Sequence, residues 1–302
     1  MLILTREEVE AALDPQALLD AVSAGFQALS MGAVDAPPRQ AVSGDGGQVL
    51  LMGGRVADGP VAAKLVGVFG GNAARGLDTH LALVCLLDAT TGRPLALMDG
   101  EAITALRTAA GSALSTRALA REDAGVLAVV GSGVQARAHL RMLPLVRPFA
   151  DVRLVARDAS AASRLGVSPG SVTGADVVCL CTSSPTPVLH FDEVAPGTHV
   201  TSVGFAPPGG ELDPELATRG SLFVETQQAF SPPPAGCAEL AGLDPTSGTE
   251  LGAVLSGRAP GRGNPDEITV YKAMGHIAED AAAATLVYET ALERGLGRQI
   301  DL

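Results

Sequence analysis

The sequence predicts an α/β protein in which a doubly wound, Rossmann-type nucleotide domain is joined to an α+β domain. From about residue 124 onward, short apolar runs alternate with helical patterns, which is typical of βαβ units and a parallel sheet. A glycine-rich loop follows the first of these runs. The preceding part of the chain instead combines helices with hairpin-like strands. We therefore expect one domain over residues 1–118 and a second domain over 119–269.

Composition and charge exclude several classes of protein. With 47% hydrophobic and 18% charged residues, the 302-residue chain is too apolar to be disordered. Its net charge of −12 argues against nucleic acid or an anionic membrane as the main partner. No apolar stretch approaches the roughly 20 residues of a membrane helix. The N-terminus shows no signal peptide, so we expect a cytoplasmic location.

The cysteines predict neither a metal site nor a disulfide framework. Cys85, Cys179, Cys181 and Cys237 lack the spacing of zinc ligands. We expect reduced thiols throughout.

The first domain is expected to begin with two helices. Thr5–Glu8 is a capping box that starts the first helix. Asp14 followed by Pro15 starts the second helix, which Gly32 ends. An alanine-rich helix is expected over 101–120. Between these helices, strands are expected at 48–52, 61–68, 80–87 and 94–98, the last two forming a hairpin.

The second domain is expected to alternate strands with helices. Helical patterns follow the first two strands, through about residues 145 and 165. The chain closes with a long helix over 275–294, which carries an apolar stripe and is ended by Gly295. The expected strands are 125–130, 152–156, 175–181, 199–203 and 222–225.

The loop Gly131–Ala136 predicts nucleotide binding, because it stands between an apolar strand and a helix. Gly131 would make the tight turn, and Gly133 would let the backbone approach a pyrophosphate. Ala136 still permits close packing of the helix on the strand. The helix N-terminus supplies unpaired N–H groups for the phosphates.

The end of the second nucleotide-domain strand bears on the choice of cofactor. A ribose 2′-hydroxyl is met there by Asp or Glu, and a 2′-phosphate by Arg. Arg157 comes first and Asp158 directly follows it. This order favours NADP(H) over NAD(H), whereas a shift of one residue would favour NAD(H).

Two lysines stand out, because all other basic residues in the chain are arginine. Lys64 and Lys272 both lie in apolar, strand-like segments, among 21 basic residues in total. Lysine in such a place invites a specific reason. For Lys272 we favour the simpler interpretation, a strand lysine whose ammonium group reaches water.

The chain resembles the ornithine cyclodeaminase/mu-crystallin family over nearly its whole length. The order and spacing of the matching segments are far more specific than any single motif. They are Ala36–Arg39, Ala62–Val66, Gly71–His80, Thr104–Ala110, Gly131–Ala136, Cys181–Pro187, Pro260–Arg262, Ile268–Gly275 and Glu279–Asp280.

The resemblance implies a two-domain homodimer that moves hydride between a nicotinamide and the α-carbon of an amino or imino acid. Residues 1–118, completed by the closing segment 270–302, would bind substrate and form the dimer. Arg39 and Arg107 match the family's carboxylate-binding arginines, since a guanidinium fork suits a carboxylate. Lys64 matches its site lysine, which makes Lys64 the expected catalytic residue and a substrate ligand.

The expected cofactor-binding positions combine those that the phosphate loop and the end of the second strand indicate with those that match the family. Some flank the substrate residues and others follow the strands of the nucleotide domain. They are Thr79, Arg107, Thr108, Gly131, Gly133, Val134, Gln135, Arg157, Thr182, Ser183 and Gly204.

One departure from the family bears on the reaction. Cyclodeaminating members place an acid directly after a glycine in the segment that follows the fifth strand. Here Cys237 follows Gly236, and Glu239 lies two residues further on. A thiol cannot replace a carboxylate that faces an ammonium group. Either Glu239 substitutes through a changed loop, or the amine-handling step is absent.

The resemblance implies an NAD(P)H-dependent reductase of an α-imino acid, such as the cyclic ketimine 1-pyrroline-2-carboxylate. An amino-acid dehydrogenase or an ornithine/lysine cyclodeaminase is the enzymatic alternative. A non-catalytic, crystallin-like NADPH-binding protein is the third. Arg39, Lys64 and Arg107 together speak against the third, because a binder of NADPH alone has no use for a carboxylate clamp.

Overall fold

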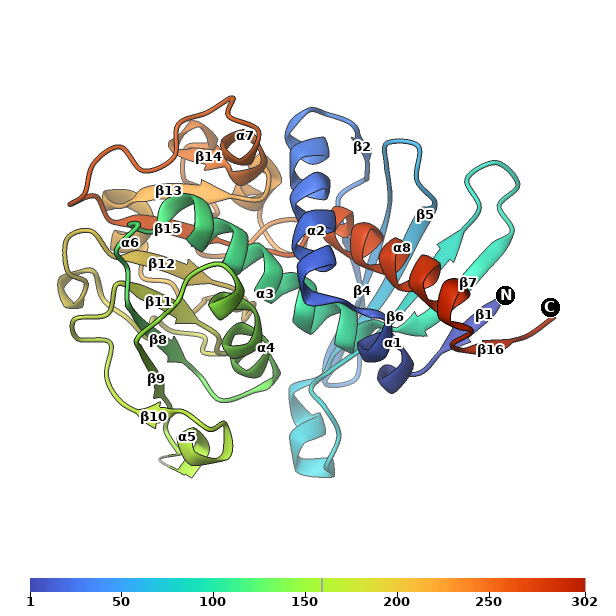
Figure 1. The fold of residues 1–302 in the computed structure, drawn as a ribbon, viewed down its shortest axis with the longest axis horizontal. Helices are drawn as coiled ribbons and strands as arrows, with labels where there is room; N and C mark the ends of the chain where they lie inside the picture. The colour runs from blue at the N-terminus through green and yellow to red at the C-terminus, as the bar shows by residue number, and fades with distance from the viewer. Residues whose placement is uncertain (159, 302) are drawn as a thin grey trace. The chain divides into compact units, whose positions relative to one another are not determined.

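The computed structural model describes residues 1–158 and 160–301 (Figure 1). Ala159, within the segment expected to be helical, and Leu302, within the expected C-terminal segment, lie outside the described residues. The chain forms two compact units, one of residues 1–107 and 276–302 and one of residues 108–275. The sequence analysis placed these divisions at 118/119 and 269/270. Their assigned roles, substrate binding and nucleotide binding, stay predictions.

The first unit is built on a mixed sheet with the order β16-β1-β7-β6-β5-β4-β2, in which β3 also pairs with β4. Antiparallel pairing runs from β4 through β7, and it places Lys64 on β5 opposite Met52 on β4 and Val84 on β6. The strands are β1 (Leu2–Leu4), β2 (Val34–Asp35), β3 (Gln40–Gly44), β4 (Gly47–Val56), β5 (Val61–Val68), β6 (His80–Leu87), β7 (Pro94–Asp99) and β16 (Arg298–Gln299).

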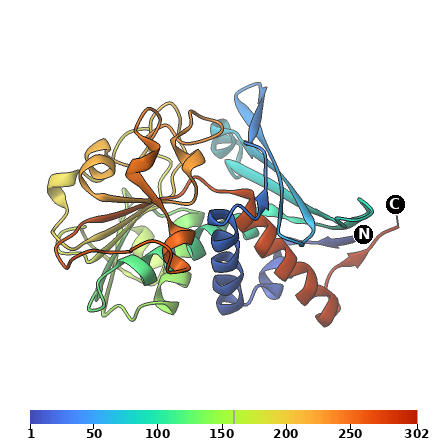
Figure 2. The same ribbon diagram turned by 90° about the horizontal axis from the view of Figure 1, so that it is seen from above.

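Three helices cover one face of this sheet: α1 (Arg6–Ala12), α2 (Pro15–Ser30) and α8 (Ile277–Arg294). In Figure 2 the dark-blue and red helices lie on the same side of the blue strands. The capping box at Thr5 and the Asp14 cap on Ala17 N confirm the two predicted helix starts. Helix α8 packs on β4, β5 and β6, and α2 packs on α8. The last helix of the chain thereby becomes part of the first unit.

The second unit contains a parallel sheet with the order β10-β9-β8-β11-β12-β15-β13-β14. This confirms the predicted doubly wound fold. Chain order runs one way from β8 to β10 and the other way from β11, so the sheet reverses between β8 and β11. The strands are β8 (Val126–Val130), β9 (Asp151–Val155), β10 (Ser168–Pro169), β11 (Val177–Leu180), β12 (His199–Ser202), β13 (Ser221–Val224), β14 (Gly248–Glu250) and β15 (Thr269–Lys272).

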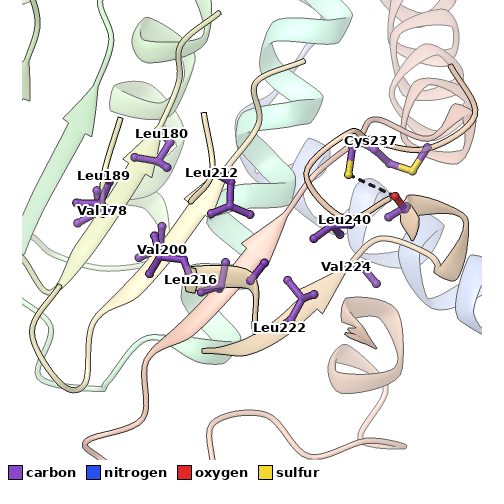
Figure 3. Packing of buried hydrophobic residues seen from close by; sticks show 14 of the residues in the cluster. Val178, Leu180, Leu189, Val200, Leu212, Leu216, Leu222, Val224, Cys237 and Leu240 are labelled. Atoms are coloured by element: carbon purple, nitrogen blue, oxygen red, sulfur yellow. Dashed lines mark hydrogen bonds between the residues drawn. The ribbon is translucent and has the colours of Figure 1, made fainter. Parts of the chain in front are cut away.

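Apolar side chains fill the space between this sheet and the segments that cover it. Figure 3 shows Val178 and Leu180 of β11, Val200 of β12 and Leu216 of α6 within one buried cluster. The helices are α3 (Gly100–Leu119, which begins in the first unit), α4 (Val134–Met142), α5 (Ser160–Arg164), α6 (Pro214–Arg219) and α7 (Leu251–Leu255), with short 3-10 turns at Gly70–Arg75, Leu143–Leu145, Phe191–Glu193, Gln227–Phe230 and Pro245–Ser247.

The segment around Lys272 is strand-like, as predicted, but it belongs to the second unit. Thr269–Lys272 forms β15, which lies between β12 and β13, whereas the predicted boundary grouped residues from 270 with the closing helix. The strand is only four residues long, so its own sequence does not show its central place in the sheet. The short strands β1, β2, β3, β10, β14 and β16 were not predicted.

The four cysteines are free thiols, as the sequence predicted. Within the described residues, no helix is long and apolar enough to cross a membrane. The same residues contain no group of three or more His, Cys, Asp or Glu side chains that could hold a metal ion.

Candidate functional site: a buried cationic cluster and a phosphate loop

Lys64 points toward the helix-covered face of the first sheet because side chains alternate along β5. Ala62, Lys64 and Val66 are buried, with exposed fractions of 0%, 1% and 8%. Leu65 lies on the opposite face and is 48% exposed. Since α8 packs on β5, the lysine side chain is directed at that helix. Strand periodicity therefore explains why this ammonium group is buried.

The first turn of α8 provides the carboxylates that meet the predicted cations. Asp280 Oδ1 accepts a hydrogen bond from Lys64 Nζ at 2.7 Å and one from Arg107 Nε at 3.2 Å. Arg107 Nη1 donates to Glu279 Oε2 at 2.7 Å. Lys64, Arg107, Glu279 and Asp280 are each no more than 4% exposed. Lys64 and Arg107, far apart in sequence, are thus brought together by one carboxylate.

The start of α8 is fixed by hydrogen bonds to its own backbone. His276 Nδ1 accepts from Ala278 N at 3.2 Å, and Glu279 Oε2 accepts from His276 N at 2.9 Å. Burial lowers the pKa of His276 to about 4, with Asp280 opposing the change and Arg107 and Arg39 supporting it. This influence places the buried Arg39 near the same cluster. All three predicted substrate residues therefore lie around the first turn of α8.

The electrostatics of the cluster favour a lysine that titrates near neutrality. Burial lowers the pKa of Lys64 from 10.5 to about 8, with Asp280 opposing the change and Arg107 supporting it. Burial acts to raise the pKa of Asp280, but Arg107 and Lys64 outweigh it and hold that pKa below its usual range. A lysine pKa near 8 suits a general acid that works at neutral pH.

Lys64 and Asp280 have hydrogen-bonding capacity that their neighbours do not use. Lys64 Nζ makes its hydrogen bond to Asp280, and an ammonium group carries more donors than this contact uses. Among the described residues, the buried Oδ2 of Asp280 has no hydrogen-bond partner. An unsatisfied buried carboxylate oxygen costs stability. Such a cost is typical of a functional site rather than of a structural ion pair.

The phosphate loop has the geometry that the sequence predicted. Gly131 has a φ of 118°, and a Cβ there would lie 2.5 Å from the carbonyl oxygen of Cys181. Gly133 precedes α4 without a side-chain cap, and a Cβ there would meet nothing within 4 Å. Ala136 is fully buried, as close packing of this helix requires. The first α4 N–H groups thus adjoin open space.

This loop fits the pyrophosphate of a dinucleotide. The open space above Gly133 lies at an uncapped helix N-terminus, where N–H groups favour an anion. Val134 is 54% exposed beside it. The buried side-chain oxygen of Gln135 has no hydrogen-bond partner among the described residues. The loop also lies where the strand order reverses, which is where such sheets bind dinucleotides.

The carboxylate of Glu211 accepts hydrogen bonds from two predicted cofactor residues that follow the next strands of this sheet. Thr182 follows β11 and donates from both its N–H and its hydroxyl to Glu211 Oε2, each at 2.7 Å. Gly204 follows β12 and donates its N–H to Glu211 Oε1 at 2.6 Å. Ser183, next to Thr182, is exposed. The sequence analysis did not single out Glu211, which has no motif around it.

The neighbouring residues Arg157 and Asp158 differ in their contacts. Asp158 accepts from Ser160 N at 2.9 Å, from Ser160 Oγ at 2.7 Å and from Arg164 Nη2 at 2.6 Å. These contacts, led by the Ser160 hydroxyl, lower the pKa of Asp158 to about 2. Arg157 is exposed just beyond β9. Asp158 is therefore occupied at the start of α5, while Arg157 is presented to solvent.

Lys272 is a strand lysine, as predicted, but the expectation that its ammonium group reaches water is wrong. Lys272 is 0% exposed, and its Nζ donates to Ser202 Oγ at 3.1 Å, Gly204 O at 2.8 Å and Glu239 Oε1 at 2.7 Å. The reason is tertiary, because β15 is a central strand with neighbours on both sides. Both lysines of the chain are buried and paired with a carboxylate.

The cysteine in place of the family's acid belongs to the apolar core. Cys237 is 1% exposed, and its Sγ donates to the carbonyl of Ala229 at 3.3 Å (Figure 3). Burial raises its pKa to about 11. Glu239 is occupied by Lys272, and its side chain is 4% exposed. The thiol is therefore neutral, and the nearby carboxylate already has a cation.

Two further predicted residues lie apart from these contacts. Thr79 precedes β6 in the first unit, and its hydroxyl lies 3.2 Å from His80 Nδ1. Thr108, buried in α3, is the first residue of the second unit.

The sequence does contain a signal for Asp280. This acid lies between Ile277 and Ala281, on the apolar stripe of the predicted closing helix, where an acid is unexpected.

Comparison with known proteins identifies the family. A ketimine reductase mu-crystallin of Mus musculus is 35% identical over 246 residues, which cover 78% of this chain and 77% of that protein. An iminosuccinate reductase of Paracoccus denitrificans is 32% identical over 321 residues, covering 100% of both. The solved structure of Thermococcus litoralis Δ1-pyrroline-2-carboxylate reductase with NADH and L-proline has a TM-score of 0.92 and 29% identity, and it covers 99% of this chain and 100% of that one. Residues 1–295 match the ornithine cyclodeaminase/mu-crystallin family, and the chain belongs to that family.

Proposed function

We propose that this protein is an NAD(P)H-dependent reductase that converts an α-imino acid, such as a cyclic ketimine, to the amino acid. The observation that carries the proposal is the buried pair of cations, Lys64 and Arg107, that meets on Asp280. A protein that only bound a nucleotide would gain nothing from burying them, because desolvation of ion pairs is costly. The imine reductases among the relatives support the same activity.

Each group of the first unit has a part in this reaction. Among the described residues of that unit, the buried charged side chains are Arg39, Lys64, Arg107, Glu279 and Asp280. The guanidinium groups of the two arginines suit a substrate carboxylate. Lys64 Nζ then donates the proton that the substrate nitrogen gains as the C=N bond becomes C–N. The carbon end of that bond receives hydride, which a reduced nicotinamide supplies when bound.

The second unit would hold the cofactor. Gly131, Gly133 and the α4 N-terminus bind the pyrophosphate, and Thr182, Ser183 and Gly204 lie after the strands on the other side of the reversal point. Cofactor orientation is the main task of the protein in such a reaction.

A turnover assay tests the proposal. Purified protein, with NADPH or NADH, is mixed with cyclic imino acids and with keto acids plus amines, and the loss of nicotinamide absorbance is followed. We expect turnover with at least one imino acid that carries a single carboxylate. Nucleotide binding without turnover on any member of the panel would instead support a non-catalytic, crystallin-like protein.

We propose NADP(H) as the preferred cofactor, with Arg157 on its 2′-phosphate. Charge-assisted contacts of this type contribute roughly 1.5–3 kcal/mol. We therefore expect Arg157→Ala to weaken NADPH binding about tenfold or more and to leave NADH binding almost unchanged. Titration of both cofactors measures this, with the exposed Arg141→Ala as the matched control. Equal weakening of both cofactors, or a wild-type preference for NADH, contradicts the assignment.

We infer that the protein is a homodimer and that the open face of the first sheet is its interface. On the face opposite Lys64, Leu65 lies opposite Leu83, and these two residues and Leu81 are each between 46% and 48% exposed. A contiguous apolar surface of this type is typical of an interface. A second copy of the chain is the expected partner.

The mass in solution tests the dimer. Leu83→Glu places a charge on an exposed position of this face, so the fold is expected to survive. We expect light scattering to show twice 30.4 kDa for the wild type and 30.4 kDa for the variant. Leu292→Glu is the matched control, because Leu292 is 57% exposed on α8. A wild-type monomer, or an unchanged dimer in Leu83→Glu, contradicts this interface.

A further inference from the structure

The buried Glu211 ties together the ends of two neighbouring strands. Its Oε2 accepts both hydrogen bonds from Thr182, which follows β11. Its Oε1 accepts from Ser202 Oγ at 3.1 Å, from Val203 N at 3.1 Å and from Gly204 N at 2.6 Å, at the end of β12. Glu211 is 0% exposed. One side chain therefore sets the relative position of two segments at the carboxyl edge of the sheet.

Lys272 holds the same segment from the other side. Both backbone polar groups of Gly204 are hydrogen-bonded, since the N–H donates to Glu211 and the carbonyl accepts from Lys272 Nζ at 2.8 Å. The Ser202 hydroxyl bridges the two, because it accepts from Lys272 and donates to Glu211. Glu239 then pairs with Lys272 from its own loop. Two opposite charges thus fix one short stretch of backbone.

Charges buried in this way are expensive and give little stability compared with apolar packing. They are retained where a defined geometry is needed, and a fully satisfied network makes a segment rigid. Here the hydrogen bonds of the Glu211 carboxylate go to residues 182 and 202–204, none of them in the apolar core of leucine and valine side chains. The Glu211 hydrogen bonds therefore fix the geometry of the strand ends.

These strand ends lie on one side of the point where the strand order reverses. In doubly wound sheets a dinucleotide crosses that point, and the ribose of its adenosine half is met at the end of the strand next to the phosphate loop. In this chain that strand is β9, on the far side of β8 from β11 and β12. The nicotinamide half is left with the ends of β11 and β12, which Glu211 holds.

We propose that Glu211 is a positioning residue for the nicotinamide half of the cofactor, acting through Thr182 and the 202–204 segment, which Lys272 braces from the opposite side. The inference rests on the proposed function, because it presumes that a nicotinamide dinucleotide binds. It adds that the two halves of the cofactor are held by separable parts of the second unit. Loss of Glu211 would loosen the nicotinamide end and leave the adenosine end in place.

Glu211→Gln tests this, because an amide cannot accept at both ends and its NH₂ group would face donors. We expect NADPH or NADH binding to weaken about tenfold or more and kcat to fall. Binding of 2′,5′-ADP and ADP, which lack the nicotinamide, is expected to stay within about twofold of wild type, since their contacts lie elsewhere. Proportional weakening of all these ligands would indicate a general structural role and overturn the inference, as would wild-type cofactor binding with unchanged kcat.

The chain offers a matched control at the opposite edge of the same sheet. Asp176 accepts from Gly125 N at 2.8 Å and Val126 N at 2.9 Å, so it also ties backbone segments together, at the start of β8. Asp176→Asn is expected to leave the ratio of cofactor to 2′,5′-ADP binding unchanged. A change of that ratio equal to the one in Glu211→Gln would overturn the inference.

Ser202→Ala removes only the bridging hydroxyl and serves if Glu211→Gln does not fold. It is expected to show the same split in smaller degree, and the absence of any split would overturn the inference. A wild-type protein that binds no nicotinamide dinucleotide in these titrations would instead overturn the proposed function itself.

Discussion

Replacing Lys64 by Met is expected to lower kcat/KM by about 10²-fold or more, the usual contribution of a positioned proton donor. Cofactor binding is expected to be unchanged, because the phosphate loop belongs to the other unit of the chain. The physical reason is that Lys64 Nζ is a buried proton donor held 2.7 Å from Asp280, and Met carries no proton to donate. Steady-state kinetics and cofactor titration on the same samples measure both quantities.

Removal of one partner of a buried ion pair costs about 3–5 kcal/mol of stability, so the fold of the Met variant must be checked by thermal unfolding. Lys64→Arg is the matched variant, because it keeps a cation for Asp280 but does not release a proton at working pH. We expect Lys64→Arg to lose activity to a similar degree while unfolding near the wild-type temperature. Near wild-type turnover by either folded variant would show that Lys64 is not the donor.

The same assignment fixes the pH dependence of the wild type. Lys64 must be protonated to donate, and burial lowers its pKa to about 8, so kcat/KM should fall as the pH rises through about 8. The charged groups that act on this lysine are Asp280 and Glu279 from α8 and Arg107 from α3. Of these, Asp280 opposes the lowering most strongly. Burial lowers the pKa of the neighbouring His80 on β6, and Lys64 acts in the same direction. An alkaline limb that persists unchanged in Lys64→Arg would assign that limb to another group.

Ornithine is expected not to be cyclodeaminated, although the chain belongs to a family that includes cyclodeaminases. Cyclodeamination requires oxidation of an amine, attack by the side-chain amine, release of ammonia and a final reduction. It needs a fixed carboxylate for the substrate amine. Cys237, which stands where the family places that acid, is a buried thiol whose pKa is raised to about 11. It is neutral at pH 7 and cannot stabilise an ammonium ion.

The carboxylate of Glu239 does not fill this gap in the structure. It pairs with Lys272 at 2.7 Å, and removing it from that pair would leave a buried ammonium group without its partner. Reduction of a preformed imine requires only a carboxylate clamp, a hydride and a proton, so it does not depend on Glu239. An assay with ornithine as the substrate therefore separates the two reactions.

The experiment is to incubate the protein with ornithine and catalytic NAD⁺ and to measure proline and ammonia. No steady release of either is expected, whereas a cyclic imino acid in a parallel reaction is reduced. Steady ammonia release that disappears in Glu239→Gln would make Glu239 the missing acid and overturn the prediction. Release that persists in that variant would point to another acid.

Much of the fold could be predicted because local signals are strong where chain periodicity and capping coincide. The Thr5 capping box, the Asp14 cap and the alternation along β5 each depend on neighbouring residues, so the sequence shows them directly. The phosphate loop is also a local signal, because the positive φ of Gly131 is a conformation that favours glycine. Short central strands such as β15 lack this local signal, because their stability comes from the neighbouring strands.

The sequence by itself, through the family pattern, determined which residues are the candidates for the chemistry, and the tertiary structure decided how they are paired. Lys64 and Arg107 were identified from the family pattern, but their common partner Asp280 lies 216 residues from Lys64 along the chain. Likewise, an apolar context around Lys272 predicts a strand but not burial, because the exposure of a strand depends on what packs beside it. Charges in a protein interior are stabilised only by partners brought together by folding. For this reason the sites of both lysines, and the role of Glu211 between two strands, could be found only in three dimensions.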